Sequence, residues 1–186
     1  MGTLTITGGT LRSRRVSTPA GLAVRPTPAR VKEALFSILA DRVENARVLD
    51  LFAGSGALGF ESLSRGAAHA TFVEKHAPTA RALHAAAKQL GVDDRCDVIA
   101  APAERAVAAL DGRFDLVFAD PPYAHEYPRD AFDALRRRHA IDERTTVVYE
   151  HSSREPAPAD PGMRLARSER YGEVALAFLQ PLASAA

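Results

Sequence analysis

The sequence contains few residues of the kinds that build disulfides, metal centres or membrane spans. Cys96 is the single cysteine among 186 residues, which excludes an internal disulfide and most cysteine-based metal sites. The six histidines show no metal-ligand spacing. No apolar run approaches the roughly 18 residues that cross a bilayer, and the start of the chain lacks the apolar core of a secretory signal. We therefore expect a cytoplasmic, monomeric protein with no metal ion and no membrane partner.

Acidic residues are missing from the first 32 positions. That segment has a formal charge of +6, which leaves −5 for the remainder of a chain whose net charge is +1. The basic residues of this arm are Arg12, Arg14, Arg15, Arg25, Arg30 and Lys32. A basic arm on an acidic body indicates a polyanionic partner, although a solubilising surface would give the same charge pattern.

Two short β-prone pieces precede the first helical pattern. Residues 4–9 and 11–18 flank Gly8-Gly9 and predict a small β-hairpin. After a connection rich in proline and glycine, apolar residues recur at helical spacing over 29–43. Thr27 is the expected N-cap of this helix, and Pro28 fits its first position.

From residue 46 onward, strand and helix patterns alternate. This rhythm predicts an α/β fold with a mostly parallel sheet and helices on both faces. The last two strands are joined at 171–173 and predict an antiparallel hairpin at the sheet edge. The expected strands, seven in all, are 46–52, 70–74, 96–100, 114–119, 145–151 and the two arms of 163–180, and the expected helices are 55–66, 78–91, 104–112 and 130–140.

The segment VLDLFAGSGALGFE matches G-x-G-x-x-G at Gly54, Gly56 and Gly59, between a predicted strand and helix. Glu74 lies twenty residues after Gly54, where an acid can accept hydrogen bonds from ribose hydroxyls. This pattern alone fits a nicotinamide dinucleotide or S-adenosylmethionine. Asp50 discriminates between them, because a carboxylate beside the loop would repel a pyrophosphate and attract a sulfonium and an ammonium group. The loop therefore favours S-adenosylmethionine.

A second motif follows the predicted strand 114–119. Asp120-Pro121-Pro122-Tyr123 leaves the sheet as a stiff, extended turn, because proline fixes φ and cannot donate to a sheet ladder. The turn delivers a carboxylate, two rigid carbonyl groups and an aromatic ring to one place. Because Asp50 and Asp120 end the first and fourth strands of the alternating pattern, we expect them to meet at the switch point of the sheet, where ligands bind.

Together these motifs resemble those of class I S-adenosylmethionine-dependent methyltransferases, whose (N/D)-P-P-(Y/F) signature accompanies methylation of an exocyclic amino nitrogen. The resemblance implies a Rossmann-like fold. It also implies a catalytic set of Asp120, Pro121, Pro122 and Tyr123. The cofactor-binding set that it implies is Asp50, Phe52, Ala53, Gly54, Ser55, Gly56, Glu74, Lys75 and Ala103. Ala103 enters through its backbone, because Pro102 occupies the slot where these enzymes carry an acid that contacts the adenine.

Nearly the whole chain is similar to the bacterial 16S rRNA guanine-N2 methyltransferases of the RsmD type. The segments that carry this similarity are GGTLRSRRV, RPTPARVKEALFSIL, VLDLFAGSGALGFESLSRGA, FDLVFADPPY and RSERYGEVALAFL. The resemblance implies a basic RNA-binding hairpin over 1–20 and a methyltransferase domain over 21–186. It further implies methylation of N2 of one guanine, of the guanine-966 type, in the rRNA of the small subunit or of a 30S assembly intermediate. The RNA contacts that it implies are Arg12, Arg14, Arg15, Arg25, Thr27, Arg30 and Lys32.

Two other functions remain compatible with these residues. D-P-P-Y also serves methylation of adenine N6 in DNA and of protein amides, although no segment is long enough for a separate DNA-recognition domain. A non-catalytic module that binds RNA or a nucleotide could keep the same fold. The intact Asp120 and Tyr123 favour an enzyme.

Overall fold

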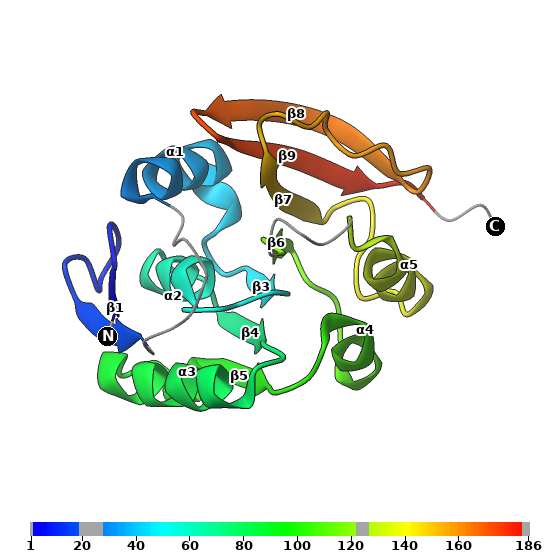
Figure 1. The fold of residues 1–186 in the computed structure, drawn as a ribbon. Coiled ribbons are helices and arrows are strands. Elements are labelled where there is room, and N and C mark those ends of the chain that lie inside the picture. The colour runs from blue at the N-terminus through cyan, green and yellow to red at the C-terminus, as the bar shows by residue number, and fades with distance from the viewer. Residues whose placement is uncertain (1, 19–27, 122–126, 184–186) are drawn as a thin grey trace.

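The computed structural model describes residues 2–18, 28–121 and 127–183. A seven-stranded sheet with the strand order β5-β4-β3-β6-β7-β9-β8 forms its centre, and β1 and β2 form a separate two-stranded sheet (Figure 1). The strands are β1 Gly2–Thr5, β2 Arg15–Thr18, β3 Arg47–Asp50, β4 His69–Val73, β5 Cys96–Ile99, β6 Leu116–Ala119, β7 Thr146–Ser152, β8 Met163–Tyr171 and β9 Val174–Pro181.

The sheet confirms the predicted architecture. Strands β3 to β7 pair in parallel, whereas β9 pairs antiparallel with both β7 and β8. The chain proceeds outward from β3 through β4 to β5, and then returns to the other side of β3 with β6. The order therefore reverses between β3 and β6, which is where open α/β sheets bind their ligands.

Helices cover both faces of this sheet. One core cluster joins the sheet to α1, α2 and α3, and a second cluster joins its other face to α4 and α5 (Figure 1). The helices are α1 Ala29–Leu39, α2 Ala57–Ser64, α3 Ala77–Leu90, α4 Ala103–Ala106 and α5 Arg129–Arg137, with short 3-10 turns at η1 Ala40–Arg42, η2 Asp93–Arg95 and η3 Val107–Ala109. Among the described residues, no helix has the length and apolarity that crossing a membrane would need.

The first and fourth helices differ from their predictions in detail. The helical pattern over 29–43 ends at Leu39, because Ala40 has φ +40° and the chain tightens into η1. Pro28 is the N-cap residue, with an extended ψ of 143°, and not the first helical residue. The predicted N-cap, Thr27, lies outside the described residues. The helix expected over 104–112 is a single turn, α4, continued by η3.

The N-terminal hairpin packs onto α2 and α3 (Figure 1). Its strands pair antiparallel, but the connection spans residues 6–14 and is longer than a tight turn at Gly8-Gly9. Leu4, Ile6 and Val16 are buried in the same core cluster as α1 to α3. The hairpin thus completes this side of the core. The predicted domain boundary at 20/21 falls outside the described residues, so the division into two domains stays a prediction.

Candidate active site

Three acidic residues lie at or near the carboxyl ends of three neighbouring strands: Asp50 is the last residue of β3, Asp120 directly follows β6, and Glu150 lies two residues before the end of β7. Asp50 pairs with Phe118, and Phe118 pairs with Val148, so Asp120 and Glu150 each lie two residues beyond that row. Side chains two residues apart in a strand point to the same face. Val48, Phe118 and Val148 belong to the core cluster under α1 to α3, so all three acids point to that side. The predicted meeting of Asp50 and Asp120 is thus confirmed, and Glu150 joins them.

The backbone N–H groups of the three glycines in the loop already donate hydrogen bonds to carboxylate or carbonyl oxygens within the protein. The Asp50 Oδ2 atom accepts the Gly59 N–H at 3.1 Å, and the Glu74 Oε2 atom accepts the Gly54 N–H at 2.9 Å. The Gly56 N–H donates to the carbonyl oxygen of Ala53 at 2.7 Å. A pyrophosphate needs free N–H groups at this turn. The three glycine N–H groups are therefore not available to one.

Backbone conformation and close packing explain why glycine stands at two of these positions. Gly56 is the N-cap of α2 with φ +76°, which L side chains rarely adopt. A Cβ atom at Gly59 would lie 2.2 Å from the Phe72 ring of β4. Gly59 thus brings α2 close to the sheet, and the loop places the start of α2 beside Asp50.

Burial of Asp50 makes its negative charge costly. The side chain is 3% exposed, and desolvation, with a further contribution from Glu74, raises the pKa of Asp50 to about 7 although the Gly59 N–H opposes the rise. A buried carboxylate of this kind stabilises a cationic ligand, since a nearby positive charge restores its ionised form.

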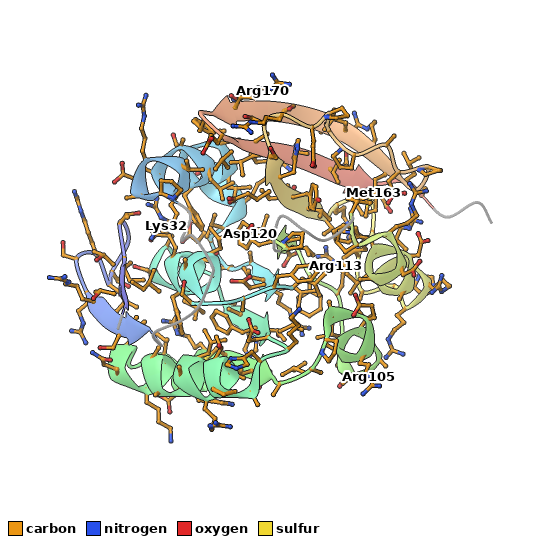
Figure 2. The ribbon with its side chains drawn as sticks, in the orientation of Figure 1. Lys32, Arg105, Arg113, Asp120, Met163 and Arg170 are labelled. Carbon is orange, nitrogen blue, oxygen red and sulfur yellow. The ribbon has the colours of Figure 1, made fainter. Side chains whose placement is uncertain are left out.

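Asp120 is half-buried at the same edge (Figure 2). Desolvation raises the pKa of Asp120 well above its usual value, and the charges of Glu150 and Asp50 raise it further. Pro121 is buried and its ring fixes φ, so the carbonyl group of Pro121 has little freedom to move. Pro122 and Tyr123 lie outside the described residues.

The other residues assigned to the cofactor follow the ends of β3, β4 and β5 and differ in exposure. Ala53 and Ala103 are buried, Phe52 and Ser55 are half-buried, and Lys75 is exposed. Ala103 opens α4 on the opposite face of the sheet, directly after the N-cap Pro102. Their cofactor-binding role stays a proposal. In the described part of the chain, no group of three or more His, Cys, Asp or Glu side chains could hold a metal ion.

The basic residues assigned to RNA divide into a surface set and one buried residue. Arg12, Arg14, Arg15 and Arg30 are exposed. Lys32 is 3% exposed, and its Nζ donates to the carbonyl oxygen of Thr5 at 2.9 Å and lies 3.5 Å from Glu61 Oε2 (Figure 2). In this structure Lys32 is an internal cation between α1, α2 and the hairpin, which corrects its assignment as an RNA contact.

The remaining assigned RNA contacts, Arg25 and Thr27, lie outside the described residues. Sequence reasoning also missed Glu61, which is fully buried in α2. Its Oε2 accepts the Thr7 N–H at 2.9 Å and its Oε1 accepts the Thr7 hydroxyl at 2.8 Å. Arg65 Nη2 lies 2.9 Å from Glu61 Oε1. Glu61 thus fastens the hairpin to the helix that begins at the glycine loop.

Glu150 was missed for a different reason. Its strand was predicted correctly, but the sequence of one strand does not show that Glu150 lies on the strand next to the one that precedes Asp120. Asp120 and Glu150 each lie two residues beyond a residue of the Phe118–Val148 pair, so their side chains point to the same face of the sheet. This spacing is present in the sequence. Using that signal requires knowing which strand pairs with which.

Known proteins resemble this chain over nearly its whole length. The family described as "Conserved hypothetical protein 95" matches residues 4–180. "Ribosomal RNA small subunit methyltransferase D" of Escherichia coli is 32% identical over 180 residues, covering 96% of this chain and 90% of that protein. YlbH of Bacillus subtilis is 32% identical over 177 residues, covering 93% and 96%.

A solved structure extends the likeness to three dimensions. The structure of yhhF from Escherichia coli has a TM-score of 0.88 and 29% identity, and the match covers 98% of this chain and 100% of that one. That protein is named a methyltransferase, and the seven-stranded sheet with an antiparallel C-terminal hairpin described above is the class I methyltransferase fold. The chain therefore belongs to the Conserved hypothetical protein 95 family, that is, to the RsmD family.

Proposed function

We propose that this protein transfers a methyl group from S-adenosylmethionine to the exocyclic N2 atom of a guanine in the rRNA of the small ribosomal subunit. The observation that carries the proposal is the row of carboxylates, Asp50, Asp120 and Glu150, beside a loop whose three glycine N–H groups are already hydrogen-bonded. Relatives across nearly the full length of the chain are named ribosomal RNA small subunit methyltransferases, which supports rRNA as the substrate.

The charge of the site supports S-adenosylmethionine over a nicotinamide dinucleotide. Asp50 and Glu74 accept hydrogen bonds from the loop N–H groups that a pyrophosphate would need as donors. Asp50 is buried with its pKa raised, so a cationic ligand beside it would be stabilised and an anionic one repelled. Bound S-adenosylmethionine supplies the electrophilic methyl group on its sulfonium. Asp50, Glu74 and the loop at 52–56 would hold the cofactor.

Asp120 and Pro121 would orient the amino group of the base. The lone pair of an exocyclic amine is delocalised into its ring, so the nitrogen is a poor nucleophile. Hydrogen bonds from the amino group to the Asp120 carboxylate and the Pro121 carbonyl would draw the nitrogen toward tetrahedral geometry. Because burial and proline fix these acceptors in advance, positioning can lower the barrier by several kcal/mol.

The raised pKa of Asp120 adds a second role. Methyl transfer leaves a positively charged nitrogen, which must lose a proton. A carboxyl whose pKa is raised by burial and by Glu150 holds a proton more readily at neutral pH than an exposed aspartate does. Asp120 would thus accept the proton after transfer. Tyr123 would stack on a base taken out of its helix.

The decisive experiment uses small-subunit rRNA and 30S particles that lack the modification. Incubation with labelled S-adenosylmethionine should place label on a single guanine, and mapping should locate it at N2. Label on an adenine of duplex DNA, with none on rRNA, would favour the DNA enzyme. Cofactor binding without transfer to any acceptor would favour a non-catalytic module. Asp120→Ala serves as the control for label that does not depend on this site.

A further inference from the structure

The two longest stretches of this chain without Asp or Glu are residues 1–32 and 75–92. Although 42 residues separate them in sequence, their described parts are in contact. Arg14 Nη2 donates to the carbonyl oxygen of Gln89 at 3.4 Å, and Gln89 Nε2 donates to the carbonyl oxygen of Arg15 at 3.2 Å. Figure 1 shows the hairpin against α3. The fold therefore merges two acid-free segments into one region of the surface.

The outer face of α3 carries its own positive charges. Arg81 and Lys88 are both exposed and lie seven residues apart, which places them two turns apart on one stripe of the helix. His84 and Ala85 lie between them and are exposed as well. Among the described residues, Arg81 and Lys88 form no ion pair. The stripe is thus open to an anion.

This stripe extends from the hairpin toward the carboxylate edge, that is, the edge of the sheet where Asp50, Asp120 and Glu150 lie. Helix α3 begins just after Glu74, at the edge where β4 ends, and its last turn contacts β2 through Gln89. Its 14 residues span about 21 Å at 1.5 Å per residue. Exposed Lys75 precedes its first turn, and the nearest following acids are Asp93 and Asp94, beyond the end of the helix. A single small anion cannot bridge cations spread over this length, whereas a phosphodiester backbone can.

We propose that the outer face of α3 is part of the RNA-binding surface, with Arg81 and Lys88 contacting phosphates between the hairpin and the carboxylate edge. This inference rests on the proposed rRNA substrate. Phosphate contacts position a nucleic acid without reading its sequence, so α3 contributes affinity and register, and Asp120 and its neighbours contribute chemistry.

The test compares two double variants of the full-length protein. Arg81→Gln with Lys88→Gln removes the two charges on α3. Arg105→Gln with Arg137→Gln removes two exposed charges from α4 and α5 on the other face of the sheet, where Arg105 extends away from the body (Figure 2). For each protein, affinity for unmethylated small-subunit rRNA is measured at several salt concentrations, together with cofactor affinity and thermal stability.

The α3 variant should bind rRNA at least about tenfold more weakly, and the slope of log K against log salt should fall by about 1.4 to 1.8 for the two lost phosphate contacts. Cofactor affinity and melting temperature should stay unchanged, and KM for RNA should rise with little change in kcat. The α4 and α5 variant should behave as the unaltered protein.

Three outcomes would overturn the inference. If the unaltered chain methylates rRNA and the α3 variant keeps its affinity and salt slope, α3 does not contact the RNA, and the proposed function stands. Equal losses in both double variants would reveal a general charge effect, which also refutes a specific surface. If the unaltered chain neither binds nor methylates rRNA, the proposed function fails, and the α3 surface fails with it.

Discussion

The two ends of helix α2 have opposite electrostatic surroundings. At its start, the glycine loop is held by the carboxylates of Asp50 and Glu74. At its other end, Ser64 accepts the N–H of Leu11 and of Thr10 from the basic hairpin through its hydroxyl and its carbonyl oxygen. The acidic end suits a cation, and the basic end suits a polyanion. A protein with a net charge of only +1 thus has both an acidic and a basic surface, because the charges are separated in space and do not cancel locally.

Removing the Asp120 carboxylate should abolish most of the methyl-transfer activity. Asp120→Ala is expected to lower kcat by roughly 10²- to 10⁴-fold, because the amino group loses its acceptor. Cofactor affinity should change by less than about threefold. The melting temperature should not fall, because the substitution removes a carboxylate repelled by Glu150 and Asp50. Single-turnover methyl transfer, cofactor titration and a thermal melt measure these quantities, and an unchanged rate would remove Asp120 from the mechanism.

Removing Glu61 should detach the hairpin from α2. Glu61→Ala leaves the buried ammonium of Lys32 without its carboxylate and strips Thr7 of two hydrogen bonds. We expect a loss of about 3–5 kcal/mol in the free energy of unfolding, measured by urea denaturation. The double variant Lys32→Met with Glu61→Leu should lose less than Glu61→Ala, because no buried charge remains unpaired. Equal losses would show that the hairpin depends on packing alone.

Replacing Asp50 with Asn should weaken cofactor binding at the acidic end. The amide oxygen can still accept the Gly59 N–H, but the negative charge is gone. Cofactor affinity at pH 8 should fall about tenfold, the effect of losing about 1.4 kcal/mol. In the unaltered protein, affinity should rise as pH increases through about 7, where Asp50 ionises, and then level off. The Asn variant should lack this step, and calorimetric titration from pH 6 to pH 8.5 would test it.

The same residue links pH to stability. The folded pKa of Asp50 lies at about 7, above its unfolded value of about 3.9, so the folded state keeps a proton that the unfolded chain releases. The free energy of unfolding should therefore fall as pH rises from 4 to 7. Asp50→Asn should remove this contribution and raise the melting temperature at pH 8 by at least about 2 °C. A lower melting temperature would show that the carboxylate stabilises the loop.

A single surface arginine of the hairpin should produce the smallest effect. Arg12→Ala is expected to weaken rRNA binding by about two- to fivefold and to lower the salt slope by about 0.7 to 0.9. Arg164→Ala, an exposed arginine of β8, is the matched control and should change neither value. A larger loss than that of the α3 double variant would place the main RNA contact on the hairpin.

Local patterns were sufficient to predict much of the fold. The alternation of strands and helices predicted the five parallel strands of the sheet, and a separate hairpin pattern predicted β8 and β9. The G-x-G-x-x-G pattern placed a turn between β3 and α2. Helix ends were less predictable, since the helical spacing continues past Leu39 while the backbone does not. The adjacency of Asp50 and Asp120 was predictable because, in an alternating α/β chain, the switch-point rule relates strand order in the sequence to strand neighbours in the sheet.

The sequence by itself determined the chemistry available to this protein: the carboxylates at strand ends, the glycine turn and the acid-free segments. Only the tertiary structure decided which charges face solvent and which face each other. Lys32 belongs to the basic arm by sequence, yet it lies inside the protein, because Glu61 and the carbonyl of Thr5 replace the water that its ammonium would lose on burial. Likewise, the union of the hairpin with α3 depends on packing between distant segments, which no local pattern encodes.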